Sequence, residues 1–206
     1  MVRCRKVHRL LVNTSLAVLL GILGTPGLHA TSQSGPPYEV ARTQGAEVLR
    51  LGWYGGMRPL TARYRLFGDG RLLREVVRQA DPTEAVRTDG VSLDEDDVTF
   101  LFDVVVHTGL ATATSEELLE ATDGVALSHP LDGATAVLDV SIARYETPEG
   151  VESPFTRRIV IPSPDYQAKR FPQVRAFSGL LDLHTALDSY FPQTVDEAVH
   201  EVEDRR

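Results

Sequence analysis

The side chains that carry out catalysis are scattered through this chain of 206 residues and form none of the common active-site patterns. The sequence contains no G-x-S-x-G, H-E-x-x-H, G-x-G-x-x-G, phosphate-loop or paired C-x-x-C motif. The histidines beyond residue 30 occur at spacings that match no zinc motif: His107, His129, His184 and His200. A small hydrolase or metal-dependent enzyme therefore remains an alternative only if groups such as His107, His129 and Asp132 converge in space.

Two other groups of reactive residue types have a simpler structural explanation. Residues 94–97 are four successive carboxylates, but they lack the glycine and the distal glutamate of an EF-hand loop. They suit the first turn of a helix, where carboxylates compensate the positive end of the helix dipole. Ser178 precedes Gly179 inside a predicted helix, and nothing in the sequence places a base beside it. We therefore predict no catalytic residue, no metal site and no cofactor.

One glycine-rich aromatic segment, Trp53-Tyr54-Gly55-Gly56-Met57-Arg58, is a candidate for protein binding. Tryptophan, tyrosine, methionine and arginine are enriched at protein interfaces and in their hot spots. The structural alternative is that Trp53 and Tyr54 fold back onto the core and that the glycines only form a turn. With the arginines of the hairpin that follows, the predicted binding residues are Trp53, Tyr54, Gly55, Gly56, Met57, Arg58, Arg63, Arg65 and Arg74.

A hairpin follows this segment, because Asp69-Gly70 lies between two runs of alternating residues. A two-residue turn would place Leu66 opposite Leu73 and Arg65 opposite Arg74. One face would then be buried and the other would be a basic surface with apolar residues set into it. The members of the predicted buried face are Ala62, Tyr64, Leu66, Leu73 and Val77, and the arginines of the basic face are Arg63, Arg65 and Arg74.

The charge of the chain argues against binding to nucleic acid or to anionic membranes. The formal net charge is −8, and without residues 1–30 the chain keeps 17 basic and 29 acidic side chains, a formal charge of −12. The charge is unevenly distributed, since residues 42–87 sum to +4 and residues 88–152 to −14. We therefore expect a strongly dipolar domain and a protein partner, without nucleic acid.

The first 30 residues have the pattern of a Sec-type signal peptide. Arg3, Arg5, Lys6 and Arg9 precede a largely apolar stretch, and Leu28-His29-Ala30 ends it with a small residue. A retained membrane anchor is the alternative, although Asn13, Thr14 and Ser15 interrupt the apolar stretch. The only cysteine, Cys4, lies ahead of that stretch, so the chain is not expected to be a lipoprotein. We predict a secreted or periplasmic protein with no stable membrane span after cleavage.

The remaining sequence predicts a single α+β domain, with a mostly antiparallel sheet of about four to five strands and two longer helices packed on one face. Residues 31–37 are expected to be a flexible linker, residues 38–192 the domain, and residues 193–206 an acidic tail. Strands are expected at residues 46–51, 60–78, 134–145 and 151–161. The expected helices run from a Ser92–Glu95 capping box to about His107, from a Thr114–Glu117 capping box to about residue 123, and from Pro172 to Phe191.

The order of these elements across residues 46–190 resembles that of emfourin-type proteins, small inhibitors of thermolysin-like metallopeptidases. In sequence the similarity covers residues 49–60, with Gly55-Gly56, and residues 101–110. The loop of that family usually continues as Phe-Ala-Gly, where this chain has Met57-Arg58-Pro59. Several bacterial families of unknown function share the Asp69-Gly70-Arg71 hairpin. The resemblance implies an α+β fold and, as a partner, a secreted peptidase.

Overall fold

The computed structural model describes residues 36–56, 60–78, 85–122, 133–147 and 150–192. The chain divides into two units, Met1–Ser34 and Gly35–Arg206, and every described residue lies in the second. Several predictions concern residues outside these ranges: the signal peptide (residues 1–30), most of the linker, Met57, Arg58, His129, Asp132, His200 and the tail (residues 193–206).

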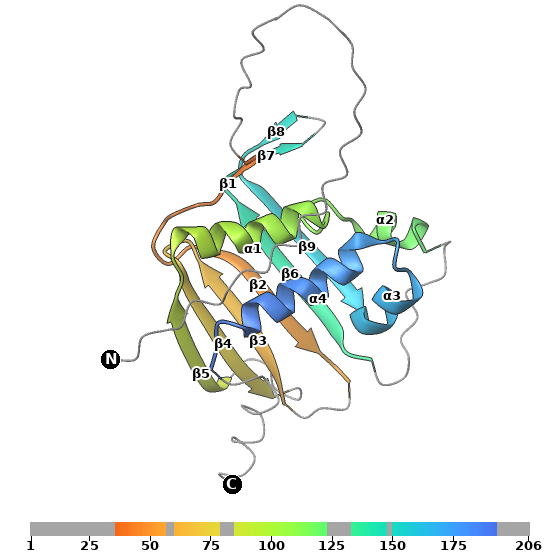
Figure 1. The fold of residues 1–206 in the computed structure, drawn as a ribbon, viewed down its shortest axis with the longest axis horizontal. Coiled ribbons are helices and arrows are strands. Elements are labelled where there is room, and N and C mark those ends of the chain that lie inside the picture. The colour runs from red at the N-terminus through yellow and green to blue at the C-terminus, as the bar shows by residue number, and fades with distance from the viewer. Residues whose placement is uncertain (1–35, 57–59, 79–84, 123–132, 148–149, 193–206) are drawn as a thin grey trace, which may run out of the picture. The chain divides into compact units, whose positions relative to one another are not determined.

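A six-stranded antiparallel sheet is the centre of the fold, with the strand order β5-β4-β3-β2-β6-β9 (Figure 1). Its strands are β2 (Glu47–Tyr54), β3 (Leu60–Phe67), β4 (Arg71–Arg78), β5 (Ala85–Ser92), β6 (Thr135–Ile142) and β9 (Phe155–Pro162). A smaller three-stranded sheet continues from one end of β6 and β9. It consists of β1 (Tyr38–Glu39), β7 (Arg144–Thr147) and β8 (Gly150–Glu152), in the order β1-β7-β8.

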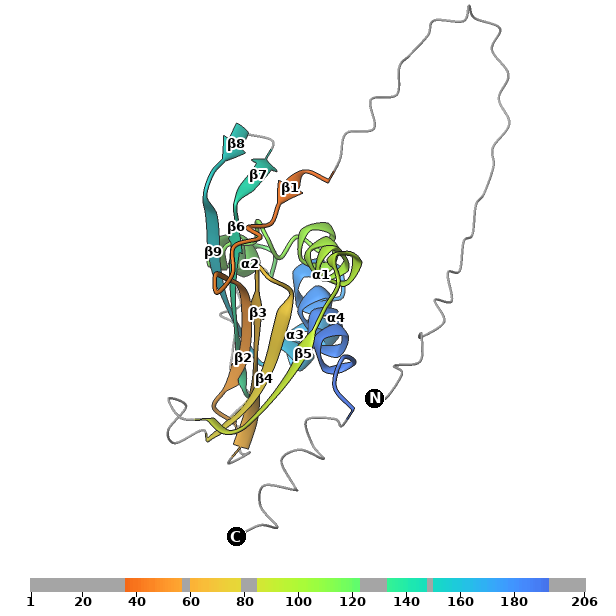
Figure 2. The same cartoon turned by 90° about the vertical axis from the view of Figure 1, so that its left-hand side faces the viewer.

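The helices pack on one face of the large sheet, as the edge-on view in Figure 2 shows. They are α1 (Glu95–His107), α2 (Ser115–Glu120), α3 (Pro164–Arg170) and α4 (Arg175–Asp188). Within the described ranges, no helix or strand lies over the opposite face, which is called the uncovered face below. The predicted α+β class and the two longer helices on one face, α1 and α4, are confirmed, and the large sheet has six strands.

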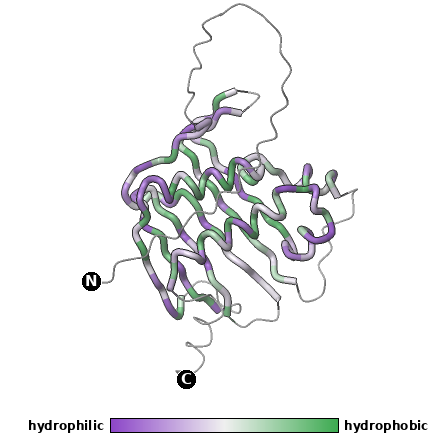
Figure 3. Tube along the Cα trace, viewed as in Figure 1, coloured by the Kyte–Doolittle hydropathy of each residue, from purple (hydrophilic) through white to green (hydrophobic). Residues whose placement is uncertain are grey.

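The core lies between the sheet and the long helices, because alternate strand residues point toward the helices. The alternation is visible as successive hydrophobic and hydrophilic segments along the strands in Figure 3. Burial of these apolar side chains is the main stabilising contribution to the fold. The buried side chains include Leu49, Leu51, Leu138 and Val140 from the sheet, Leu101, Phe102 and Val105 from α1, and Phe177, Leu180 and Leu183 from α4.

The hairpin of β3 and β4 turns through three residues, and this changes which face each β4 side chain occupies. The Gly70 N–H donates to the Phe67 carbonyl at 2.9 Å, and Gly70 has φ +83°. A three-residue loop with its last residue in the left-handed region is a common alternative to a two-residue turn. The observed register pairs Leu66 with Leu72 and Tyr64 with Arg74. The predicted register is therefore wrong by one residue, which moves every β4 side chain to the other face.

Two glycines fix this longer turn against neighbouring segments. The Gly68 N–H donates to the Ala46 carbonyl at 2.8 Å, and a Cβ at Gly68 would lie 2.0 Å from the Ala41 oxygen. The Gly70 carbonyl accepts from the Leu93 N–H at 2.9 Å. The turn is thus set by contacts with distant parts of the chain as well as by its own residues.

Strand β5 occupies residues for which the sequence predicted no strand. Its Asp89 is opposite Arg74 and its Arg87 is opposite Val76, so charged side chains occupy the helix-side positions of this edge strand. Because Ser92 is still paired with Arg71 in β5, the cap of α1 falls on Asp94, which accepts from the Asp97 N–H at 2.9 Å. The predicted Ser92 cap is therefore corrected to Asp94.

The second predicted capping box is confirmed, whereas the end of the chain contains one more helix than expected. The Thr114 N–H donates to Glu117 Oε2 at 2.8 Å, and the Glu117 N–H donates to Thr114 Oγ1 at 3.1 Å. Pro164 begins the additional helix α3, in agreement with the preference of proline for the first helical turn. Helix α4 begins at Arg175 and not at Pro172.

Candidate functional site: the uncovered face of the sheet

The uncovered face carries a row of charged side chains that crosses the central strands. In register, Arg65 on β3 is opposite Arg50 on β2, Arg50 is opposite Asp139 on β6, and Asp139 is opposite Arg158 on β9. Residues opposite each other in an antiparallel sheet share a face, so these four side chains project from the same side. By the same alternation, the charged residues of this face are Arg50, Arg63, Arg65, Arg71 and Arg158, with Glu47, Glu75 and Asp139.

Most of these charges form a continuous chain of ion pairs. Arg65 bridges two carboxylates, with its Nε 2.6 Å from Glu47 and its Nη1 3.1 Å from Glu75. Arg63 is 2.5 Å from Glu75, and Arg50 Nε is 2.7 Å from Glu47. A guanidinium that bridges two carboxylates is held in one orientation by its planar donors. The centre of the face is therefore an ordered array of charges.

The environment of Arg65 favours its charged form. Burial alone would lower the pKa of Arg65, but the hydrogen bonds and charges of Glu47 and Glu75 outweigh it and raise that pKa above its ordinary value. Arg71 and Arg65 also lie over the ring of Phe67, at 4.3 and 5.1 Å from its centroid. Cations at these distances are attracted by the ring face.

The face has a surplus of positive charge in an acidic protein. Five arginine and three carboxylate side chains of the described strands lie on this face, whereas the whole chain has a formal charge of −8. The acidic first turns of α1 and α2 lie on the helix side of the sheet. The predicted dipolar distribution is therefore organised across the sheet, with the positive side on the uncovered face.

The predicted aromatic glycine segment is divided between the two faces. Trp53 and Tyr54 are the last residues of β2, so they point to opposite sides. Trp53 lies on the helix side, with its ring centroid 4.5 Å from that of His184 on α4. The Tyr54 ring lies over Gly52, where an added Cβ would be 3.2 Å from the tyrosine ring. Trp53 therefore packs against the core, and Tyr54 remains with the uncovered face.

The two glycines after Tyr54 are exposed at the end of β2. Gly55 has φ +74° and Gly56 has φ +82°, conformations that other residues rarely adopt. Met57 and Arg58, which were predicted to extend this segment, lie outside the described residues. Of the predicted binding residues, the structure brings Tyr54, Arg63 and Arg65 to the uncovered face.

Arg74 does not belong to the basic face on which it was predicted, because of the one-residue register difference. It is completely buried on the helix side, with Nη2 2.8 Å from Asp89 and Nη1 3.3 Å from Asp188. Its guanidinium also lies 4.5 Å from the centroid of the Phe191 ring. Burial would raise the pKa of Asp89, but hydrogen bonds from Arg74 and Arg87 lower it below its ordinary value. Arg74 therefore anchors the end of α4 to the sheet.

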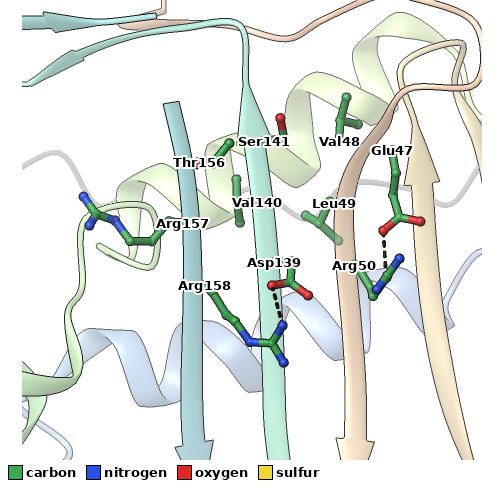
Figure 4. Close-up of a pocket in the computed structure, with 10 residues that line it drawn as sticks. All are labelled: Glu47, Val48, Leu49, Arg50, Asp139, Val140, Ser141, Thr156, Arg157 and Arg158. Carbon is green, nitrogen blue, oxygen red and sulfur yellow. Dashed lines mark ion pairs between the residues drawn. The ribbon is translucent and has the colours of Figure 1, made fainter. Parts of the chain in front are cut away.

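A pocket of about 340 Å³ opens on the uncovered face among β2, β6 and β9 (Figure 4). Arg50 and Glu47 line one side, and Asp139 and Arg158 line the other. The sequence did not predict this pocket, because its charged residues come from three different strands. The only available signal was the alternation of polar with apolar residues in β6 and β9.

His107 and His184, the histidines that the structure describes, have different neighbours. His107 is exposed at the end of α1, with Nδ1 2.8 Å from the Asp103 carbonyl, and His184 packs between Trp53 and Tyr64. His129 and Asp132 lie outside the described residues. In the described part of the chain, no group of three or more His, Cys, Asp or Glu side chains is arranged to hold a metal ion.

Among the helices that the structure describes, none is both long enough and apolar enough to span a bilayer. No protein-family model and no curated protein matches this chain.

Proposed function

We propose that the protein is a secreted or periplasmic, non-enzymatic binding module that holds an acidic surface of another protein against its uncovered sheet face. The observation that carries this proposal is the charge of that face, five arginines against three carboxylates in a chain of net charge −8. Complementary potentials steer two proteins together and select the orientation in which they bind.

The size and composition of the face support a protein as the partner. Six strands at about 4.8 Å spacing and eight residues at about 3.4 Å rise give a face of roughly 24 Å by 25 Å, or about 600 Å². A standard protein interface buries about 800 Å² on each partner. The exposed turn at Gly55-Gly56 adjoins the face at the end of β2 and would extend the contact toward that size.

The residue types at the face support the same conclusion. Arginine and tyrosine are the residues most enriched at binding hot spots, together with tryptophan, and the face presents five arginines and Tyr54. The ion pairs of Arg65 with Glu47 and Glu75 hold its guanidinium before a partner arrives. A surface that is ordered in advance loses less conformational entropy on binding.

The resemblance to emfourin-type proteins favours a secreted peptidase as the partner. The glycine pair carries the resemblance, and it lies at the edge of the proposed binding face. The partner peptidase would then meet the positively charged face with an acidic surface of its own. Inhibition of a peptidase by the purified protein would support this narrower proposal.

Capture of the partner tests the proposal. The protein expressed from the full chain is immobilised and exposed to the extracellular fraction of the source. A variant with Arg71→Glu and Arg158→Glu reverses two exposed charges on β4 and β9, at well-separated positions of the face. The matched control, Arg170→Glu with Arg175→Glu, makes the same charge change on α3 and α4.

We expect the face variant to lose capture of an acidic protein and the control to retain it. Captured amounts should also fall as salt is raised, because exposed charges are screened within about 8 Å at physiological ionic strength. Equal capture by the face variant and the control would contradict the proposed function.

A further inference from the structure

The pocket among β2, β6 and β9 has the size of a subsite within the uncovered face. Its volume of about 340 Å³ lies near the lower end of the range for ligand pockets, roughly 300 to 1,000 Å³. This space is sufficient for one polar side chain with a few waters, since a water occupies about 30 Å³ in the liquid. The pocket contains no residue of the aromatic glycine segment, so it is an observation independent of that segment.

Two arginines on opposite sides of the pocket retain donor capacity. Arg158 is 67% exposed, and its ion pair with Asp139 is long, at 3.6 Å. Arg50 is 40% exposed, and its Nε lies 2.7 Å from Glu47 Oε1. Each guanidinium has five N–H donors in a planar fork. These two ion pairs therefore leave N–H donors on both arginines for a further acceptor.

The charges around the pocket favour an anion of low charge. Arg50 and Arg158 line it together with the carboxylates Glu47 and Asp139, and Glu47 is shared with Arg65. Arg157 also borders the pocket, but it is opposite Val140 on the helix side, and its guanidinium lies over the Phe155 ring. The surplus positive charge that attracts a single carboxylate is therefore that of the whole uncovered face, five arginines against three carboxylates. A phosphate dianion would be opposed by both resident carboxylates, which lie on either side of the pocket.

Two hydroxyl groups complete a donor set that suits a carboxylate. Ser141 on β6 and Thr156 on β9 are opposite each other in register and both line the pocket. A hydroxyl can donate one hydrogen bond to a carboxylate oxygen, and a guanidinium can donate two in parallel. We propose that this pocket binds one aspartate or glutamate side chain of the partner protein, held by Arg50 and Arg158 with Ser141 and Thr156. This inference rests on the proposed function of the uncovered face.

Nuclear magnetic resonance of the ¹⁵N-labelled protein tests the subsite without the partner. The probe is N-acetyl-glutamate N-methylamide, and the matched control is N-acetyl-glutamine N-methylamide, which has the same shape without the charge. We expect the acid to shift the amide signals of Ser141, Thr156 and Arg158 in a saturable manner, and the amide to leave them unchanged. Inorganic phosphate is titrated separately and should bind more weakly than the acid.

Two variants locate the binding. Arg158→Gln should weaken binding of the acid by roughly tenfold, which corresponds to the loss of a charge-assisted contact. Arg71→Gln removes the same charge from the same face, outside the pocket, and should leave binding of the acid unchanged. Equal shifts with acid and amide, tighter binding of phosphate, or equal weakening by both variants would overturn the carboxylate subsite.

The subsite and the proposed function can fail separately. Loss of partner capture by the Arg71→Glu, Arg158→Glu variant, with no response to the glutamate probe, would overturn the subsite while supporting the binding face. Unchanged capture by that variant would overturn the binding face itself.

Discussion

Tyr64 and Arg74 lie directly opposite each other in the β3–β4 hairpin, and both contact Asp188 at the end of α4. The Tyr64 hydroxyl donates to Asp188 Oδ1 at 2.8 Å, and Arg74 Nη1 lies 3.3 Å from the same oxygen. Burial, together with the adjacent Asp188 carboxylate, raises the pKa of Tyr64. This cluster connects the central strands to α4 and separates a structural arginine from the arginines of the uncovered face.

Replacement of Arg74 by methionine should strongly destabilise the fold. The change leaves Asp89 and Asp188 without their buried cation, and breaking a buried ion pair in this way costs about 3 kcal/mol. Urea denaturation measures the change in the free energy of unfolding. Arg71→Met, at an exposed position, is the control and should change it by less than about 0.5 kcal/mol. A similar small change for both variants would show that the Arg74 cluster does not stabilise the protein.

Asp89 should contribute stability that depends on pH. Because the pKa of Asp89 is lowered in the folded state, its contribution is present above the ordinary value of 3.8 and is lost as the pH falls through the lowered value. Asp89→Asn should therefore cost more free energy of unfolding at pH 7 than at pH 3, measured by urea denaturation at each pH. The same cost at both pH values would be inconsistent with the lowered pKa.

Alanine substitutions at Gly45 and Gly70 should distinguish two costs in stability, the backbone strain at a positive φ and the close approach of Gly70 to Leu93. Gly45 has φ +79° with no atom within 4 Å of an added Cβ, so Gly45→Ala should cost only the strain of about 1 kcal/mol. At Gly70, with φ +83°, the Cβ would lie 2.5 Å from the Leu93 oxygen, and Gly70→Ala should cost roughly 3 kcal/mol. Thermal unfolding of the two variants measures the difference. Equal melting temperatures would argue against a tightly packed turn.

Replacement of Trp53 should lower the stability of the protein without weakening capture of the partner. Trp53→Ala removes the contact with His184 and should lower the free energy of unfolding by about 2 kcal/mol, since the ring is only partly buried. At a temperature where it stays folded, this variant should capture the partner normally. Reduced capture by a folded Trp53→Ala variant would mean that the tryptophan contacts the partner.

Much of the fold was predictable because its strongest signals are local. The alternation of Leu138, Val140 and Ile142 with the polar Asp139 and Ser141 indicates β6. The apolar stripe from Val98 to Val105 indicates α1. The Thr114 capping box identifies the start of α2 from two residues, Thr114 and Glu117. Each of these patterns depends only on the periodicity of the element itself.

The hairpin register was not predictable from its own residues. Asp69-Gly70 is compatible with a two-residue turn. The structure has a three-residue turn that also includes Gly68, because Gly68 contacts Ala41 and Ala46. That single residue decides whether Arg74 is on the surface or in the core. Strand β5 was missed for a related reason. Two of its helix-side residues, Arg87 and Asp89, are charged, and Asp89 is neutralised by the buried Arg74 of β4.

The candidate site was only partly predictable because it is assembled by strand order. Arg63 and Arg65 were expected on the exposed face, and they lie there. Glu47, Asp139 and Arg158 join them only because β2 lies between β3 and β6, and β9 follows β6. No spacing along the chain carries this information, since residues about 90 positions apart become neighbours in the sheet.

The most direct test of the proposed binding face is to map where a captured partner contacts the protein. Arginines are labelled with a dicarbonyl reagent in the free protein and in the complex, and the labelled sites are quantified by mass spectrometry. We predict that the partner protects Arg71 and Arg158 on the uncovered face and leaves Arg170 and Arg175 on the helix side fully reactive. Protection of Arg170 and Arg175, with Arg71 and Arg158 unchanged, would contradict the central claim.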